Sequence, residues 1–130
     1  MLLAHGGCAC AQSSEWSRLT DEALAAYEKG NFESAEQLLG KALTLAEESK
    51  GDDSRLIKSL DNLSLIYFKE GDYARTEPLL MRALSMREKK YGESSIKIAE
   101  GLHNLGLLYM AEDKYKGAKS TFKLLCIRQC

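Results

Sequence analysis

Cysteine and histidine are the residue types of this chain that could bind a metal, and the cysteines lie near its two ends. Cys8 and Cys10 stand in "HGGCAC" near the start. Cys126 and Cys130 stand in "CIRQC" at the end. Thiolates bind zinc and copper, as does an imidazole such as that of His5, but the spacings are not those of a zinc finger. Because the two clusters also lie at opposite ends of the chain, we predict no metal and no cofactor, with cysteine-based metal binding as a minor alternative.

His103 falls on a helical pattern, with Glu100 three residues before it. This pair could hold a charged imidazole, but it lacks a nucleophile or a third group that would complete a catalytic site. The sequence also contains no glycine-rich phosphate loop, no nucleophile elbow and no HExxH motif. We therefore predict that the protein is not an enzyme.

The composition is ordinary for a globular protein and bounds the chain to one domain. The sequence has 130 residues, of which 28% are charged and 45% are apolar, and its formal net charge is −1. This balance favours no nucleic-acid partner, and no apolar run is long enough to span a membrane. Valine and threonine are scarce and Pro78 is the single proline, which argues against a β-sheet fold. The chain is therefore predicted to be helical.

The first residues could be a targeting segment. In "MLLAHGGCACAQ", Ala9 and Ala11 are spaced as at a signal-peptidase site before Gln12. The apolar run is short and no basic residue begins it, so residues 1–11 would be a clipped signal remnant. An unstructured leader of a cytosolic protein fits as well. We expect residues 1–14 to be a disordered leader or signal remnant, and we favour a cytoplasmic location over a secreted or periplasmic one.

One sequence plan occurs three times along the chain. The stretches "LDNLSLIYFKEGDY" at residues 60–73 and "LHNLGLLYMAEDKY" at residues 102–115 are nearly the same at an offset of 42. Their apolar residues recur with the spacing of one face of a helix, and a short turn and a second periodic segment follow. An earlier copy, "LAAYEKGNFESAEQLLGKAL" at residues 24–43, follows the same plan at an offset of 41. The sequence therefore predicts three helix–turn–helix units.

Small residues of each unit fall where two helices must approach closely. Ser64 and Gly106 take this place on the first helices, and Gly30 and Gly71 supply the left-handed turn that ends a first helix. Such units bury their apolar faces by stacking on the next unit, which predicts a helical solenoid. The small residues that take this place on the second helices are Ala35, Thr76 and Ala118. The aromatic residues predicted to fill the gap at the turns are Phe32, Tyr73 and Tyr115.

The pattern Leu-Gly/Ser-x-x-Tyr followed by Gly-Asp/Asn-Tyr/Phe-x-x-Ala resembles the tetratricopeptide repeat. Its longer spacing is similar to the variant of kinesin light chains. The resemblance implies an all-α fold, a right-handed α-solenoid of three tetratricopeptide-type helix–turn–helix repeats. We place them at about residues 16–50, 55–91 and 96–130, within a domain over residues 15–130.

The resemblance also implies a function. In this family the first helices line a concave groove, and positions beside the Leu-Tyr stripe contact the ligand. We therefore predict a non-catalytic protein–protein interaction scaffold that binds an extended peptide or a partner helix in this groove. The predicted groove residues are Thr20 and Leu24 from the first repeat, Lys58, Asp61, Asn62, Leu65 and Lys69 from the second, and Glu100, His103, Asn104 and Leu107 from the third.

Asn62 and Asn104 occupy the same position one repeat apart. A side-chain amide donates and accepts at once, so it can hold the backbone of an extended peptide of any sequence. The alternative is that these asparagines only face solvent. We favour binding, because a residue that is unfavourable in helices recurs in the same register.

The end of the chain offers an alternative role. Several apolar residues fall on a last helix that no further repeat follows, and leaving side chains of that size in water is unfavourable. Either the chain is a fragment of a longer array, or this edge pairs with a second copy in a homodimer. The chain would then be a self-associating assembly module. The predicted exposed edge consists of Phe122, Leu124, Leu125 and Ile127.

Overall fold

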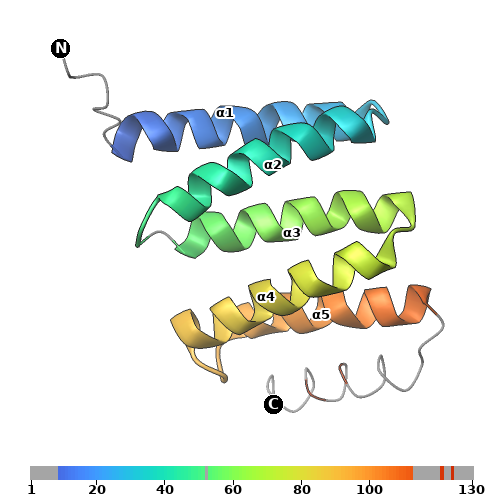
Figure 1. Ribbon diagram of the computed structural model, residues 1–130. Coiled ribbons are helices and arrows are strands. Elements are labelled where there is room, and N and C mark those ends of the chain that lie inside the picture. The colour runs from blue at the N-terminus through green and yellow to red at the C-terminus, as the bar shows by residue number, and fades with distance from the viewer. Residues whose placement is uncertain (1–8, 52, 113–120, 122–123, 125–130) are drawn as a thin grey trace. The chain divides into compact units, whose positions relative to one another are not determined.

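The computed structural model describes residues 9–51, 53–112, 121 and 124. In these ranges the regular structure is helical throughout (Figure 1). The helices are α1 (Ala9–Glu28), α2 (Phe32–Glu48), α3 (Asp53–Glu70), α4 (Tyr73–Tyr91) and α5 (Ile96–Ala111). The predicted all-α fold class is therefore confirmed.

The chain divides into two compact units, Met1–Ile66 and Tyr67–Cys130. The first unit holds α1, α2 and most of α3. The second holds the last turn of α3 together with α4 and α5. The boundary between the units thus falls inside a helix, and it does not coincide with a boundary between the predicted repeats.

The turns that end α1 and α3 use the glycines that the sequence indicated. Gly30 has a φ of 78° and Gly71 a φ of 79°, a left-handed conformation that side chains with a Cβ rarely adopt. The next residue begins the following helix as an N-cap: the Asn31 side chain accepts a hydrogen bond from the Ser34 amide, and Asp72 accepts one from the Arg75 amide. Glycine and N-cap together set the reversal of the chain at both turns.

An aromatic pair fills the space inside each turn, as predicted. The ring centroids of Tyr27 and Phe32 lie 5.7 Å apart, and those of Phe68 and Tyr73 lie 5.6 Å apart. The rings are tilted by 47° and 48°, so the two turns have nearly the same geometry. Tilted rings at this separation attract each other, which stabilises the turn from within.

The Asp72 cap should make stability depend on pH. The side-chain hydrogen bond from Arg75 Nε, and then the one from the Arg75 amide, hold the pKa of Asp72 below its ordinary value. A carboxylate with a lowered folded-state pKa contributes stability above its unfolded pKa, and the contribution is lost as pH falls through the lowered value. We expect Asp72→Asn, which keeps an oxygen cap but removes the charge, to be less stable than wild type near neutral pH.

This stability difference between wild type and Asp72→Asn should shrink from about pH 5 downward. Urea unfolding of both proteins across that range measures it. The Asn31 cap carries no titratable group, so Asn31→Ala should lower stability by a similar amount at every pH. A difference for Asp72→Asn that is constant with pH would contradict the assignment.

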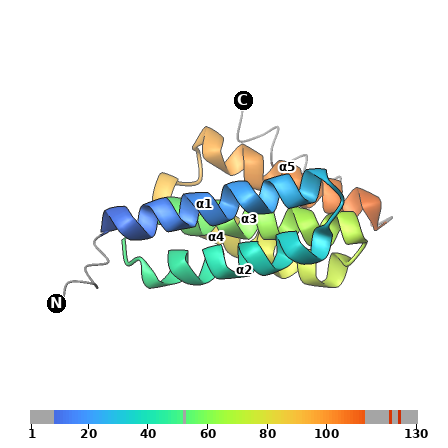
Figure 2. The same ribbon diagram turned by 90° about the horizontal axis from the view of Figure 1, so that it is seen from above.

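In the first unit, α2 packs against α1, and both views show the two helices side by side (Figures 1 and 2). The contact face of α2 is a stripe at helical spacing, in which Ala35, Leu39 and Ala42 are completely buried. Because alanine has a small side chain, the helix backbones can come close together, as predicted for Ala35. Among the described residues of this unit, the buried apolar ones are Leu19, Ala23, Ala35, Leu39, Ala42, Ala46, Ile57, Leu60, Leu63 and Ile66.

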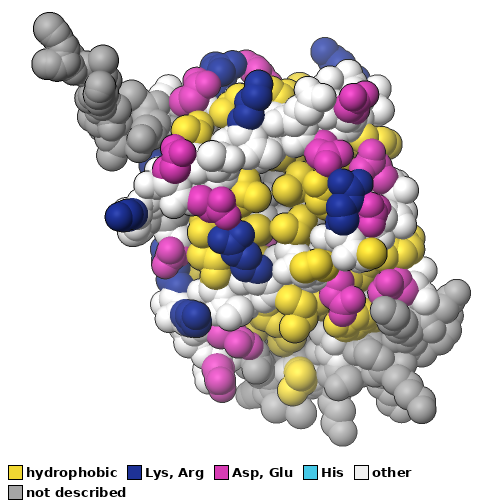
Figure 3. Space-filling model, viewed as in Figure 1, with side chains coloured by type: hydrophobic (Ala, Val, Ile, Leu, Met, Phe, Trp, Pro, Cys, Tyr) yellow, Lys and Arg dark blue, Asp and Glu magenta, His cyan; other side chains and the backbone are white. Residues whose placement is uncertain are grey.

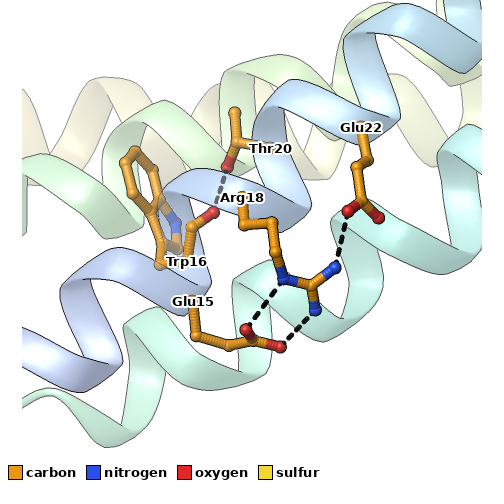
Figure 4. A network of polar contacts seen from close by, with 5 residues as sticks. All are labelled: Glu15, Trp16, Arg18, Thr20 and Glu22. Atoms are coloured by element: carbon orange, nitrogen blue, oxygen red, sulfur yellow. Dashed lines mark hydrogen bonds and ion pairs between the residues drawn. The ribbon is translucent and has the colours of Figure 1, made fainter.

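A tryptophan joins α1 to α3 in the first unit. The indole Nε1 of Trp16 donates a hydrogen bond of 2.8 Å to the hydroxyl of Ser59, which is completely buried. The guanidinium of Arg55 lies 5.9 Å from the ring centroid, at the outer limit of a cation–π contact. On the solvent side of α1, Arg18 forms ion pairs of 2.6 Å with both Glu15 and Glu22 (Figure 4). These exposed pairs favour the helical state of α1 but contribute little to tertiary stability.

In the second unit, α4 and α5 pack around a core of leucines. Leu80, Leu105 and Leu108 form the buried cluster, and Phe68, Tyr73, Leu84 and Tyr109 pack against it. Tyr109 also donates a hydrogen bond of 2.7 Å to Glu77, which ties α5 to α4. Burial, and then this hydrogen bond, raise the pKa of Tyr109 to about 12, so the phenol keeps its proton at neutral pH.

Two predictions differ from the structure. Helix α1 begins at Ala9, so residues 9–14 are helical rather than part of a disordered leader. The stretch "ACAQSSE" contains two alanines, which have the highest helix propensity. Thr20, predicted to face a ligand, is buried with 4% exposure, and its hydroxyl donates to the backbone oxygen of Trp16. The predictions for Ala118 and Tyr115 lie outside the described residues.

Candidate functional site

The predicted ligand-binding residues of α3 lie along its less buried side. Lys58 and Lys69 are exposed, Leu65 is 37% exposed, and Asp61 and Asn62 are half-buried. Ile57, Leu60, Ser64 and the other residues of the opposite side are buried in helical register. The apolar stripe of α3 faces the core, and this orientation of the helix leaves the predicted residues on its other side, at the surface.

The predicted residues of α5 are arranged in the same way. Glu100 and His103 are exposed, Leu107 is 44% exposed, and Asn104 is half-buried. Leu65 and Leu107 stand at the same repeat position, one on each helix, and both leave a large part of an apolar side chain in water. Of the two predicted residues of α1, Thr20 is buried, as described above, and Leu24 is half-buried.

Asn62 has a hydrogen-bond donor for which the described part of the chain offers no acceptor. Its amide nitrogen Nδ2 is buried, and among the described residues no acceptor lies within hydrogen-bonding distance of it. A buried donor without an acceptor costs about 1–3 kcal/mol, so such atoms are rare in native proteins. A carbonyl oxygen from another chain could satisfy this donor after rotation of the side chain.

Glu100 has a role inside the protein as well as on the surface. Arg87 is buried, with 5% of its surface exposed, and its Nη2 donates to Oε2 of Glu100 over 3.5 Å. A buried guanidinium needs a negative charge nearby, because its desolvation is costly. The side chain of Glu100 is 62% exposed, so the carboxylate can accept further hydrogen bonds from solvent or from a partner.

The charges on the face that Figure 3 shows do not single out a strongly acidic or basic ligand. Figure 3 shows acidic and basic side chains interspersed with hydrophobic ones. No group of histidine, cysteine, aspartate and glutamate side chains in the described part of the chain could hold a metal ion. Likewise, none of the described helices combines the length and the apolar character needed to cross a membrane.

Two exposed apolar residues of α5 were missed in the sequence. Ile96 is 70% exposed and Met110 is 47% exposed. Ile96 precedes the repeated stretch at residues 102–115, and Met110 lies within it at a position that the Leu-Tyr pattern does not include, so the comparison of repeats singled out neither. The signal available in the sequence was their helical spacing from Glu100, His103 and Leu107, which places all five residues on one face of α5.

One residue of the predicted edge can be placed. Leu124 is 44% exposed, and the edge itself stays a prediction. The other three residues, Phe122, Leu125 and Ile127, lie outside the described residues, as do His5 and the side chains of all four cysteines.

Comparison with known proteins identifies the family. The Tetratricopeptide repeat profile matches residues 18–89 and 55–124. A solved structure, BtubC (BKLC) from P. vanneervenii, is similar with a TM-score of 0.80 at 20% sequence identity, over 88% of this chain and 45% of that one. The chain thus spans less than half the length of this structural relative, and the likeness concerns the fold. A comparison with curated proteins gave no significant match. Because the family profile covers most of the sequence and the helix pairs have the expected turns, the chain belongs to the tetratricopeptide repeat family.

Proposed function

We propose that this chain is a non-catalytic protein-binding module whose partner contacts the exposed sides of α3 and α5. Tetratricopeptide repeats are in general protein-interaction scaffolds, and the family assignment supports that coarser role here. The described residues of these two helices offer amides, charges of both signs and exposed leucines. Such a mixture suits a protein segment better than a small charged metabolite.

The observation that carries the proposal is the amide of Asn62. Its Nδ2 atom is buried without an acceptor in the described chain, and Asn104 stands at the same place one repeat later. An asparagine amide can donate to a backbone carbonyl and accept from a backbone N–H at once. Each asparagine would then hold a partner segment by its main chain, so recognition would tolerate different partner sequences.

Exposed leucines supply the apolar part of the contact. Leu65 and Leu107 are 37% and 44% exposed at equivalent positions of α3 and α5. Covering an aliphatic side chain that is partly in water is favourable in proportion to the area removed from solvent. The leucines would add affinity, and the neighbouring amides would add orientation.

The test removes both amides. We expect Asn62→Ala/Asn104→Ala to weaken partner binding about 30-fold, since each lost hydrogen bond contributes about 1 kcal/mol. Affinity capture with immobilised wild-type protein provides a partner, and titration calorimetry of that partner against wild type, both single variants and the double variant gives the changes. Comparing the two single changes with the double change shows whether the amides act on the same ligand.

Gln37→Ala is the matched control, because Gln37 is an exposed amide side chain on α2, which is not one of the proposed contact helices. It should leave binding unchanged. All variants should keep the helicity of the wild type and none should lower its unfolding midpoint, since none removes a completely buried side chain and Asn62→Ala removes a buried donor without a described acceptor. A partner that binds the double variant as tightly as the wild type would refute the proposed role of the asparagines.

A further inference from the structure

Helix α5 carries an exposed stripe along its whole length. It consists of Ile96, Glu100, His103, Leu107 and Met110, which are spaced by four, three, four and three residues. All five are exposed, with fractions of 70% for Ile96, 44% for Leu107 and 47% for Met110. The opposite side of the same helix, including Ile98, Leu102 and Leu105, is buried in its own unit.

Alternation of four and three is the spacing of the seam between two helices in a coiled coil. A seam of this kind is normally covered by a second helix, because exposed aliphatic side chains gain from burial. The equivalent positions of α3, 42 residues earlier, are Ser54, Lys58, Asp61, Leu65 and Phe68. Leu65 is exposed, but Phe68 packs against the leucine core of the second unit, so α3 has one exposed apolar residue in this stripe whereas α5 has three.

The order of residues along the seam is complementary to itself. The two alternating seam positions of a coiled coil are called a and d. In an antiparallel pair of helices, each a position of one helix faces a d position of the other. When two α5 helices are placed so that Ile96 faces Leu107 of the second copy, Glu100 faces His103 of the second copy, and the same two contacts recur by symmetry. Apolar residues then meet at both ends, and a carboxylate meets an imidazole twice in the middle.

Neighbouring registers lack this match. A shift by one heptad places Glu100 opposite Met110 of the second copy and His103 opposite Leu107 of the second copy, which buries polar groups against apolar ones. A parallel pair places Glu100 against its own copy, so like charges meet. One register therefore pairs four of the five stripe residues, Ile96 with Leu107 and Glu100 with His103, and leaves Met110 outside the contact.

We propose that the partner of the α5 surface is a second copy of this chain, which pairs through α5 in an antiparallel, two-fold symmetric arrangement. The inference deepens the proposed function and rests on the proposed use of the α5 surface, but it does not depend on the asparagine amides. Glu100 can keep its 3.5 Å contact with Arg87 of its own chain while a second imidazole approaches, because its side chain is 62% exposed. The contact covers one helix of 16 residues, so the dimer is weak and concentration-dependent.

Two single substitutions test the register. In a pair of Ile96→Lys chains, both introduced lysines face Leu107 of the other copy; in a pair of Leu107→Glu chains, both introduced carboxylates face Ile96 of the other copy. Each variant alone should dimerise at least about tenfold more weakly than wild type, because two apolar contacts are lost. An equimolar mixture should form a heterodimer, since one end then has a lysine facing a glutamate and the other end keeps its native contact.

Analytical ultracentrifugation between about 10 µM and 1 mM measures these equilibria, a range suited to weak small interfaces. Met110→Glu is the register control: by itself it should dimerise as tightly as wild type, because Met110 faces none of the seam residues of the second copy in the proposed pair. Wild type that stays monomeric throughout, a dimer that neither Ile96→Lys nor Leu107→Glu weakens, or a Met110→Glu variant that dimerises as weakly as Ile96→Lys would each overturn the proposal.

The asparagine variant separates this inference from the proposed function. Asn62→Ala/Asn104→Ala should dimerise like wild type, because neither residue lies in the proposed seam. Loss of partner binding in that variant, combined with a monomeric wild type, would leave the proposed function standing and remove the dimer. A dimer that is sensitive to Ile96→Lys, combined with unchanged partner binding by the asparagine variant, would leave the dimer standing and remove the proposed role of the asparagines.

Discussion

Leu108→Ala should lower the free energy of unfolding by about 3 kcal/mol. Leu108 is completely buried and belongs to the cluster that it forms with Leu80 and Leu105 between α4 and α5. Truncation removes apolar surface from the core and leaves a cavity, because neighbouring leucines that also hold other contacts can only partly collapse into the space. Urea unfolding followed by circular dichroism gives the change.

The neighbouring residue is the matched control for this substitution. Leu107 has the same side chain on the same helix but is 44% exposed. Leu107→Ala should therefore change stability by less than about 0.5 kcal/mol, while removing part of the proposed contact surface. Equal losses for the two leucines would show that α5 is not oriented as described.

Gly101→Leu should lower stability by about 3 kcal/mol through overpacking. A Cβ at Gly101 would lie 2.9 Å from Cδ1 and 3.5 Å from Cβ of Leu84, so α4 and α5 touch at this point without room for a side chain. Leu84 could turn away from a single methyl group, but a leucine at position 101 would need the helices to separate. Thermal or urea unfolding compares the variant with wild type.

Gly40 provides the opposite case within the same protein. It lies in the interior of α2, and a Cβ built there meets no atom within 4 Å. Because glycine is about 1 kcal/mol less favourable than alanine inside a helix, Gly40→Ala should raise stability by about that amount. If Gly101→Leu were neutral while Gly40→Ala stabilised the protein, the close approach of α4 and α5 at Gly101 would be wrong.

These stability variants and the binding variants involve different residues of the same helices. Leu108 and Gly101 are buried, whereas Glu100, His103 and Leu107 lie on the exposed side of α5. A change of binding without a change of stability can therefore be assigned to the surface. Arg87 is the exception, because its buried charge is paired with Glu100 on the exposed side, so substituting Glu100 would affect both properties.

The helix pairs and their turns were readable from the sequence because the signals are local. A helical face shows as apolar residues three and four positions apart, and Gly30 and Gly71 mark the points where the backbone must turn into the left-handed region. Asn31 and Asp72 appear in the sequence only as part of the repeat motif, and the structure shows that they cap α2 and α4. Three similar copies then identified the repeat family, since agreement among copies makes a chance match improbable.

The solvent exposure of each residue could not be predicted from these local signals. Thr20 and Asp61 stand at equivalent positions of their repeats, yet Thr20 is 4% exposed and Asp61 is half-buried. Trp16 bonds to Ser59, 43 residues away, and Arg87 becomes buried beside Glu100. Each depends on which other helix lies against that point of the surface.

For the candidate surface as well, the sequence predicted some features and only the tertiary structure revealed others. Helical spacing was sufficient to place Asn62 and Asn104 at matching positions, because position on a helix face follows from the 3.6-residue turn alone. Two features appear only in the folded chain: the buried Nδ2 atom of Asn62, which has no acceptor among the described residues, and the exposure of Ile96 and Met110. Burial and hydrogen-bond partners arise from side chains distant in sequence, and their packing depends on the volumes that meet in the core rather than on the pattern of any one helix.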